Sequence, residues 1–215
     1  MTPADDDLTD TAGGTAAGGP SASVAGPVRR RRVALFATVA MIALALDIVS
    51  KVLVVANLDA YEHERILGGA IYLQQARNSG AAFSLGTGFT VILSLVALVV
   101  VGVIVRTAGR MRSAGWAVAL GLILGGAVGN LGDRIFRAPG VFRGRVVDWI
   151  SLFGPDAEHW PIFNLADSAI VCGAVLAILL SLFGVPFDGV RRPAGQNRDA
   201  ARHAEPASTD KPANQ

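Results

Sequence analysis

Residues 113–134 read SAGWAVALGLILGGAVGNLGDR, a run that stays largely apolar until the Asp133–Arg134 dipeptide. An α-helix rises about 1.5 Å per residue, so about 20 residues cross the ~30 Å hydrocarbon layer of a membrane. Gly121, Gly125 and Gly129 recur at every fourth position and form one small-residue face, which lets a neighbouring helix approach closely. Residues 113–132 therefore predict a membrane-spanning helix that packs tightly against a partner.

Three further apolar segments, residues 33–56, 88–105 and 165–187, have similar lengths. Helices in the core of a soluble protein are rarely apolar on all sides over such lengths. The composition agrees, since 52% of the residues are hydrophobic and only 17% are charged, whereas about 25% are charged in an average soluble domain. Because the backbone must satisfy its own hydrogen bonds in lipid, these segments are expected to be helices. The predicted fold is an all-α membrane protein, a four-helix transmembrane bundle.

Composition also excludes several classes of function. The net charge of +2 and the lack of a basic stripe argue against nucleic-acid binding. Cys172 is the single cysteine, which excludes a disulfide framework and a cysteine-rich zinc site, and we expect it to be a small buried side chain. His63, His159 and His203 are too scattered for a metal site, and no glycine-rich phosphate loop is present. We expect neither a metal nor an organic cofactor.

Basic residues near the ends of the spans predict the orientation. They cluster before the first span, between the second and third spans, and after the fourth span, so these three regions are expected to be cytoplasmic together with both termini. The second outer loop also carries arginines, which makes the charge difference moderate. The cytoplasmic group is Arg29 to Arg32, Arg106, Arg110, Arg112, Arg191 and Arg192, and the outer group is Arg134, Arg137, Arg143 and Arg145.

Two long loops, residues 57–87 and 133–164, join the spans on the predicted outer side. Connections longer than about 12–15 residues are more often functional or disordered than simple links. The apolar and aromatic content of these loops argues against disorder. We therefore expect short strands near residues 70–76 and 144–149, which would form a small extracytoplasmic β-cradle on the membrane surface.

The two ends of the chain differ from the rest in composition. Residues 1–28 and 188–215 are polar and lack the apolar content needed for a core, so both are predicted to be disordered cytoplasmic tails. Residues 29–187 are then the four-span membrane domain.

Charge inside a span costs at least ~2.5–3.5 kcal/mol at the bilayer centre, so each such residue needs an explanation. Asp47 and Lys51 lie one helical turn apart with the acid first, the better order for an ion pair. We interpret them as a neutralised pair that fixes helix packing rather than as catalytic groups. Asn130, Asp133 and Arg134 end the third span, where an Asp133–Arg134 contact at a solvated helix end is the simplest interpretation.

Two further aspartates lie in apolar surroundings on the predicted outer side. Asp148 is part of the sequence RVVDWI (145–150), and Asp167 lies where the fourth span begins, a position at which it could simply cap the helix. If the two carboxyls face each other, repulsion keeps one proton shared between them. One could then accept a proton from water while the other hydrogen-bonds the carbonyl of a peptide bond. Both interpretations remain open on spacing alone.

Five sequence blocks resemble, in order and spacing, those of the bacterial lipoprotein signal peptidases, also called signal peptidase II. The resemblance covers roughly residues 33–187, and the tails fall outside it. Trp149 is a mild departure, since phenylalanine is more usual there. The blocks are DIVSK (47–51), NSGAAF (78–83), GGAVGNLGDR (125–134), VVDW (146–149) and FNLADS (163–168).

The resemblance implies a membrane-embedded aspartyl endopeptidase that removes the signal peptide from diacylglyceryl-modified prolipoproteins. The cut would fall on the N-terminal side of the lipidated cysteine, with Asp148 and Asp167 as the catalytic pair and no cofactor. We expect a monomer in the bacterial cytoplasmic membrane, in contact with membrane lipids, with its active site at the outer face. The residues implied to line or order the site are Asp47, Lys51, Asn78, Gly80, Asn130, Asp133, Arg134 and Asn164.

Two other classes of protein fit parts of the sequence. A small proton-coupled transporter or channel subunit could use Asp47 and Lys51 as a proton path, although the polar residues gather at the outer side and no repeated halves are visible. A non-catalytic scaffold could use the small-residue face of the third span, and both outer aspartates would then be dispensable.

Overall fold

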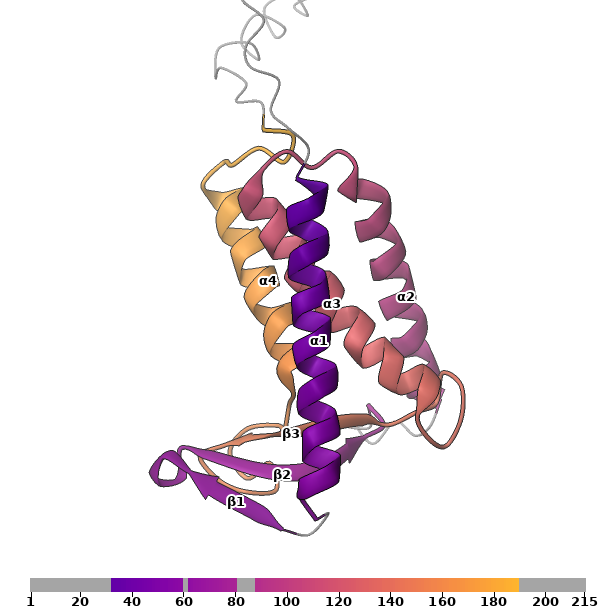
Figure 1. Cartoon of the computed structure of the whole chain (residues 1–215), viewed down its shortest axis with the longest axis vertical. Helices are drawn as coiled ribbons and strands as arrows, with labels where there is room; N and C mark the ends of the chain where they lie inside the picture. The colour runs from indigo at the N-terminus through magenta and orange to yellow at the C-terminus, as the bar shows by residue number, and fades with distance from the viewer. Residues whose placement is uncertain (1–31, 60–61, 81–87, 190–215) are drawn as a thin grey trace, which may run out of the picture.

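The computed structural model describes residues 32–59, 62–80 and 88–189. Within these ranges the chain forms four helices, each long and apolar enough to cross a membrane. They stand side by side with a small sheet across one end (Figure 1). The predicted four-helix bundle is confirmed. The helices are α1 (Val33–Asn57), α2 (Gly88–Ala108), α3 (Ala114–Phe136) and α4 (Leu165–Leu182).

Some predictions concern residues outside the described ranges. The two tails predicted to be disordered, residues 1–28 and 188–215, lie outside the described residues, apart from residues 188 and 189. The last three residues of the NSGAAF block, residues 81–83, also lie outside the described part of the chain.

Helix α3 is the central element, because half of the residues in its span are buried, a larger share than in the other three helices. The predicted glycine face packs against α1: a Cβ atom at Gly125 would lie 2.6 Å from the carbonyl oxygen of Ala40 and 2.7 Å from the Cβ of Ala43. Gly126 and Gly173 give α4 the same close approach, since a Cβ at Gly173 would lie 2.6 Å from the carbonyl oxygen of Ala119. Small residues thus let the helix backbones meet.

The sheet has three antiparallel strands in the order β1–β2–β3 within the described residues. The strands are β1 (His63–Ile66), β2 (Ile71–Asn78) and β3 (Val146–Leu152), with a 3₁₀ turn, η1 (Leu67–Gly69), between the first two. Strands β2 and β3 confirm the two predicted strands with shifted ends, and β1 was not predicted. Pairing of Ala76 with Asp148 and of Asn78 with Val146 brings the end of β2 beside the start of β3.

Two helix boundaries differ from the predicted spans for identifiable reasons. Helix α3 continues to Phe136 rather than stopping at residue 132, because the charge of Asp133 is paired within the protein. Helix α4 ends at Leu182 rather than at residue 187. There Gly184 adopts a φ of 63°, Val185 N–H donates to the carbonyl of Leu180 at 2.8 Å, and Pro186 follows. Helix α2 runs to Ala108 instead of residue 105.

Both ends of the described chain lie at the end of the bundle opposite the sheet (Figure 1). The backbone N–H of Arg32 donates to the carbonyl of Met111 at 3.0 Å, and that of Arg112 donates to Phe187 at 3.2 Å. The start of α1, the α2–α3 connection and the segment after α4 therefore share one end, as the grouping of basic residues predicted.

The expectation that Cys172 is buried is wrong. Its side chain is exposed on the surface of α4, next to the exposed Val171. The apolar run indicated burial, but in a membrane helix apolar residues also face lipid, so an apolar sequence does not distinguish the two environments.

Candidate active site

Asp148 lies in β3 and is only 2% exposed. Each of its carboxyl oxygens accepts a hydrogen bond from a side-chain amide. Asn164 Nδ2 donates to Oδ1 at 2.6 Å, and Asn78 Nδ2 donates to Oδ2 at 2.8 Å. Three separate elements of the chain, the end of β2, β3 and the start of α4, therefore hold this carboxyl group in place.

Gly80 explains why the Asn78 amide is fixed. The Gly80 backbone N–H donates to Asn78 Oδ1 at 2.7 Å, which leaves Nδ2 of Asn78 directed to Asp148. Gly80 has a φ of 81°, and a Cβ there would lie 2.5 Å from Cδ1 of Leu93. A side chain would be both strained and crowded at this position, so the turn requires glycine.

Asp167 occupies the first turn of α4, as the capping interpretation predicted. Asn164 is the N-cap, and its Oδ1 accepts the backbone N–H of Asp167 at 3.0 Å. Asp167 Oδ2 in return accepts the backbone N–H of Asn164 at 3.2 Å, which completes a capping box. Its Oδ1 accepts a second bond, from Asn130 Nδ2 at 2.7 Å. The aspartate is thus a capping group and part of the polar cluster at once.

Asn164 joins the two aspartates. It is fully buried, its Nδ2 donates to Asp148, and its Oδ1 accepts from the backbone of Asp167. The same Nδ2 lies 3.1 Å from Asn130 Oδ1. Sequence spacing alone places the two carboxyls only on the same side of the membrane. In the structure a shared asparagine brings them to one site.

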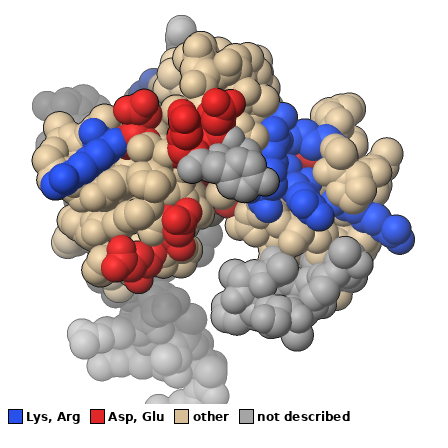
Figure 2. Space-filling view, turned by 90° about the horizontal axis from the view of Figure 1, so that it is seen from below, with Lys and Arg blue, Asp and Glu red and all other residues tan. Residues whose placement is uncertain are grey.

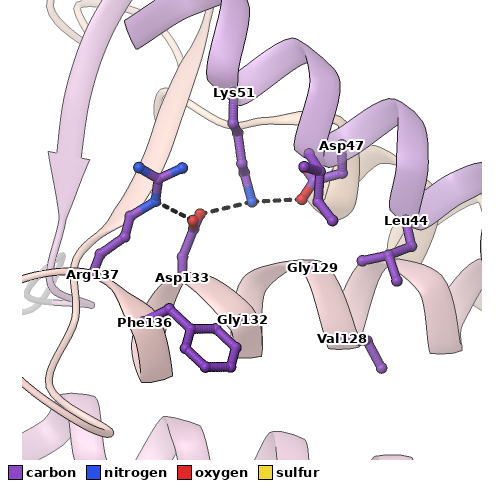
Figure 3. A pocket seen from close by; sticks show the side chains of 10 residues that line it. Leu44, Asp47, Lys51, Val128, Gly129, Gly132, Asp133, Phe136 and Arg137 are labelled. Atoms are coloured by element: carbon purple, nitrogen blue, oxygen red, sulfur yellow. Dashed lines mark hydrogen bonds and ion pairs between the residues drawn. The ribbon is translucent and has the colours of Figure 1, made fainter.

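Lys51 lies behind this site in a buried charge network (Figure 3). Its Nζ is 2.7 Å from Asp47 Oδ2, 2.9 Å from Asp133 Oδ2 and 3.0 Å from Asn130 Oδ1. Three acceptors match the three donor positions of an ammonium group. The predicted Asp47–Lys51 pair is confirmed, and Lys51 has two further partners that the spacing did not reveal.

The network also fixes the backbone that carries the aspartates. Asp47 Oδ1 accepts the backbone N–H of Ala166 at 3.0 Å, one residue before Asp167. Asp133 Oδ2 accepts the backbone N–H of Val147 at 3.2 Å, one residue before Asp148. Each buried carboxylate therefore positions one of the two candidate catalytic residues through its neighbour in the chain.

The expected Asp133–Arg134 contact at a solvated helix end is wrong. Asp133 is 6% exposed and pairs with Lys51 and with Nε of Arg137. Arg134 donates from Nη1 to the carbonyl of Asn130 at 3.1 Å, and its charge interacts with Asp167 and Asp148. Its buried Nε has no hydrogen-bond partner among the described residues.

Arg137 is the member of the network that the sequence interpretation missed. Asp133 and Arg137 are separated by four residues, a spacing that would have indicated an ion pair had the helix been extended past residue 132.

The surroundings of Asp148 change its acidity. The pKa of Asp148 is raised to about 6 overall. Burial is the largest cause and the charge of Asp167 acts in the same direction, while hydrogen bonds from Asn78 and Asn164 and the charge of Lys51 lower the pKa. A carboxyl with a pKa near the working pH can both accept and donate a proton, which suits general acid–base catalysis.

An apolar groove of about 250 Å³ leads to the polar cluster. It runs between α2 and α4 across the surface of α3, and Asn130 and Arg134 line its polar part. The apolar lining residues are Leu93, Val96, Ala97, Val100, Ile123, Ala127 and Ile170. Among the described residues, no group of three or more His, Cys, Asp or Glu side chains is arranged to hold a metal ion.

Comparison with known proteins agrees with the resemblance noted in the sequence. The profile of the family described as Signal peptidase (SPase) II matches residues 39–183. The chain is 51% identical over 160 residues to a lipoprotein signal peptidase of Streptomyces coelicolor, which covers 74% of this chain and 76% of the relative. It is 50% identical over 171 residues to a lipoprotein signal peptidase of Mycobacterium avium, with 79% and 91% covered.

A solved structure described as a bacterial membrane enzyme has the same fold. It matches with a TM-score of 0.63 at 24% identity and covers 73% of this chain and 97% of the solved chain. The sequence matches extend over most of the four helices and the sheet, so the chain belongs to the signal peptidase II family and is a peptidase of a bacterial membrane.

Proposed function

We propose that the chain is an aspartyl endopeptidase in which Asp148 and Asp167 act as one catalytic pair. The observation that carries this proposal is the junction at Asn164, which contacts both residues within one buried cluster. The substrate is a diacylglyceryl-modified prolipoprotein, and the bond cut lies on the N-terminal side of its lipidated cysteine. Family membership favours this function over a transporter or a scaffold.

The proposed reaction is a direct attack of water on the peptide carbonyl. One carboxylate removes a proton from the water as the oxygen bonds to the carbonyl carbon, while the other carboxyl, protonated, hydrogen-bonds the carbonyl oxygen. Collapse of the tetrahedral intermediate breaks the C–N bond, and the leaving amine takes a proton from the pair. Because the two carboxyls interact, the protonation state belongs to the pair rather than to either residue.

The remaining polar residues act as positioning groups in this proposal. Asn78 and Asn164 orient Asp148, Asn130 orients Asp167, and Lys51 orients Asn130. Arg134 lines the groove and places its positive charge beside both aspartates. The groove between α2 and α4 supplies an apolar surface for the membrane-embedded part of the substrate.

The location of the site follows from the substrate. A lipid-anchored peptide leaves the bilayer only at a cost of about 0.8 kcal/mol for each buried CH₂ group, so cleavage has to occur at membrane level. Asp148 lies on β3 and Asp167 in the first turn of α4. Both are therefore at the end of the bundle that carries the sheet (Figure 1), which suits that requirement. We assign the sheet end to the outer face of the cytoplasmic membrane and both termini to the cytoplasm, following the distribution of arginines.

A matched pair of substrates tests this function. The purified enzyme is incubated with one prolipoprotein in two forms, with and without the diacylglyceryl group on the cysteine, and the products are analysed by mass spectrometry. We expect a single cut before the lipidated cysteine and little cleavage of the unmodified form. Equal cleavage of both forms, or a cut elsewhere, would contradict the proposed specificity.

A further inference from the structure

A second groove lies on the face of α3 that is turned away from the groove beside the aspartates. Val128, Gly132 and Phe136 line it, whereas Ala127 and Arg134 line the other groove. At about 100° per residue the two sets project from nearly opposite sides of the helix. The second groove has a volume of about 510 Å³ and is bounded by α1 on its other side.

This α1–α3 groove is apolar along most of its length. Leu44 and Ile48 from α1 and Val128 and Phe136 from α3 form its apolar walls. Asp47, Lys51 and Asp133 line it as well (Figure 3). Ile48 is 50% exposed and Phe136 is 87% exposed, so within the described residues no protein segment covers them. Gly132 opens onto the groove, and a Cβ there would meet no atom within 4 Å. In a membrane such a groove is filled by lipid.

An arginine-lined cavity of about 410 Å³ adjoins the sheet end of this groove. Its charged lining residues are Arg77, Arg137 and Arg145. The fold brings them together from three places. Arg137 is the C-cap of α3. Gly144 packs against the last carbonyls of the same helix, which places the next residue, Arg145, near its end. Arg77 lies on β2, where it pairs with Val147 of β3. Arg137 also lines the α1–α3 groove, so the two hollows meet at this residue.

The protein balances only part of the positive charge of the cavity. Asp47 and Asp133 balance Lys51 and Arg137, and among the described residues no carboxylate forms an ion pair with Arg77 or Arg145. Desolvation and the nearby charge of Arg137 lower the pKa of Arg77, while the charge of Asp133 acts in the opposite direction. Figure 2 shows an uneven charge distribution at the sheet end, with most Lys and Arg side chains on one side and most Asp and Glu side chains toward the other.

We propose that the arginine cavity and the α1–α3 groove form one binding site for a membrane phospholipid with an anionic headgroup. The guanidinium groups of Arg77, Arg137 and Arg145 hold the phosphate, and an acyl chain lies in the groove. Arginine suits phosphate because its planar donors match the oxygens. Figure 3 shows the terminal nitrogens of Arg137 directed away from Asp133, which leaves them available to a ligand.

The groove favours a lipid over free phosphate as the source of this anion. A free ion needs only the arginines, whereas an acyl chain accounts for the exposed apolar walls that continue from the same cavity. The groove shares Asp47, Lys51 and Asp133 with the charge network behind the aspartates. The inference is nevertheless tested by lipid binding rather than by cleavage, so its failure is distinguishable from failure of the catalytic proposal.

Lipid binding to the purified protein in a non-ionic detergent tests the inference by native mass spectrometry. Phosphatidylglycerol is compared with phosphatidylcholine, and inorganic phosphate is added as a competitor. Two variants probe the two parts of the site, Arg145→Gln for the headgroup and Gly132→Leu for the acyl chain. Their controls are Arg65→Gln, an exposed arginine on β1 outside the cavity, and Gly102→Leu, a glycine of α2 with equally open space.

We expect phosphatidylglycerol to bind more tightly than phosphatidylcholine. Arg145→Gln should weaken its binding about fivefold, the loss that corresponds to one basic residue at an anionic membrane surface. Gly132→Leu should weaken it as well, and both controls should bind as the unmodified protein does.

Four results would overturn the inference. Equal binding of both lipids, or equal effects of Arg145→Gln and Arg65→Gln, would exclude the headgroup site. Equal effects of the two leucine variants would exclude the groove. Displacement of phosphatidylglycerol by inorganic phosphate at a comparable concentration would assign the cavity to free phosphate instead.

Discussion

The carboxyl group of Asp148 illustrates how single residues set the chemistry of this site. It is buried, it receives one amide donor on each oxygen, and its pKa is raised to about 6 by burial and by Asp167. Spacing placed Asp148 near the membrane surface, but the donors come from residues 70 positions earlier and 16 positions later in the chain. Such long-range contacts are visible only in the fold.

The raised pKa predicts how cleavage depends on pH. If one carboxyl of the pair must be protonated, kcat/KM should fall as the pH rises through about 6, because the proton is then lost from the free enzyme. Asn78→Ala removes a hydrogen bond that lowers the pKa of Asp148, so the alkaline limb should move to higher pH. Asn57→Ala, at an exposed asparagine of α1, is the control and should leave the limb in place. A limb that does not move in Asn78→Ala would refute this role of Asn78.

Lys51 provides a second prediction at the scale of one residue. Lys51→Met leaves Asp47 and Asp133 without their shared ammonium, and removing one partner of a buried ion pair costs about 3–5 kcal/mol. We expect a marked fall in Tm in detergent and partial recovery when Asp47→Asn is added, because a neutral amide is cheaper to bury. An unchanged Tm in Lys51→Met would show that the network does not support the fold.

At the scale of helices and strands, the apolar runs of the sequence predict the membrane spans better than the residues at which they end. The charge of Asp133 predicts that the third span ends at residue 132, yet pairing with Lys51 and Arg137 lets the helix continue to Phe136. The apolar run predicts a fourth span that continues through Gly184 and Pro186, although both residues favour the end of a helix. All four residues of strand β1 are exposed. The strand therefore has no buried face, and its sequence lacks the alternation of apolar and polar residues that would predict a strand.

The close contact between α1 and α3 makes a prediction at this scale. Gly125→Ala places a Cβ within 2.7 Å of Ala40 and Ala43, so the helices have to separate. Overpacking of this kind costs about 1–3 kcal/mol, and we expect a lower Tm in detergent. Gly102→Ala is the matched control, since a Cβ there meets no atom within 4 Å. A Tm equal to that of the control would show that α1 can move without loss.

At the scale of the whole molecule, four helices carry a small sheet at one end and both chain ends at the other (Figure 1). The sequence was sufficient for the helix count and for the family, because both depend on local composition and on short blocks. Asn164 joins the two aspartates, and three arginines form a cavity near β2. Both features depend on how the sheet packs against the bundle, which cannot be predicted from composition.

The proposed orientation can be measured with single cysteines. In a Cys172→Ala background, Glu64→Cys on β1 should react with a membrane-impermeant maleimide in intact cells that lack an outer-membrane barrier. Arg110→Cys, between α2 and α3, should react only after the membrane is opened. The reverse pattern would place the sheet in the cytoplasm and would contradict the assigned side.

The most direct test of the catalytic pair is cleavage of a diacylglyceryl-modified prolipoprotein by Asp148→Asn and Asp167→Asn, with Asp59→Asn as an exposed control. Substrate binding is measured alongside cleavage, since asparagine is nearly isosteric with aspartate. We expect both variants to bind substrate but to lose at least about a hundredfold in kcat, the scale of general acid–base catalysis. If either variant cleaves at close to the unmodified rate, that aspartate is structural and the two-aspartate mechanism is wrong.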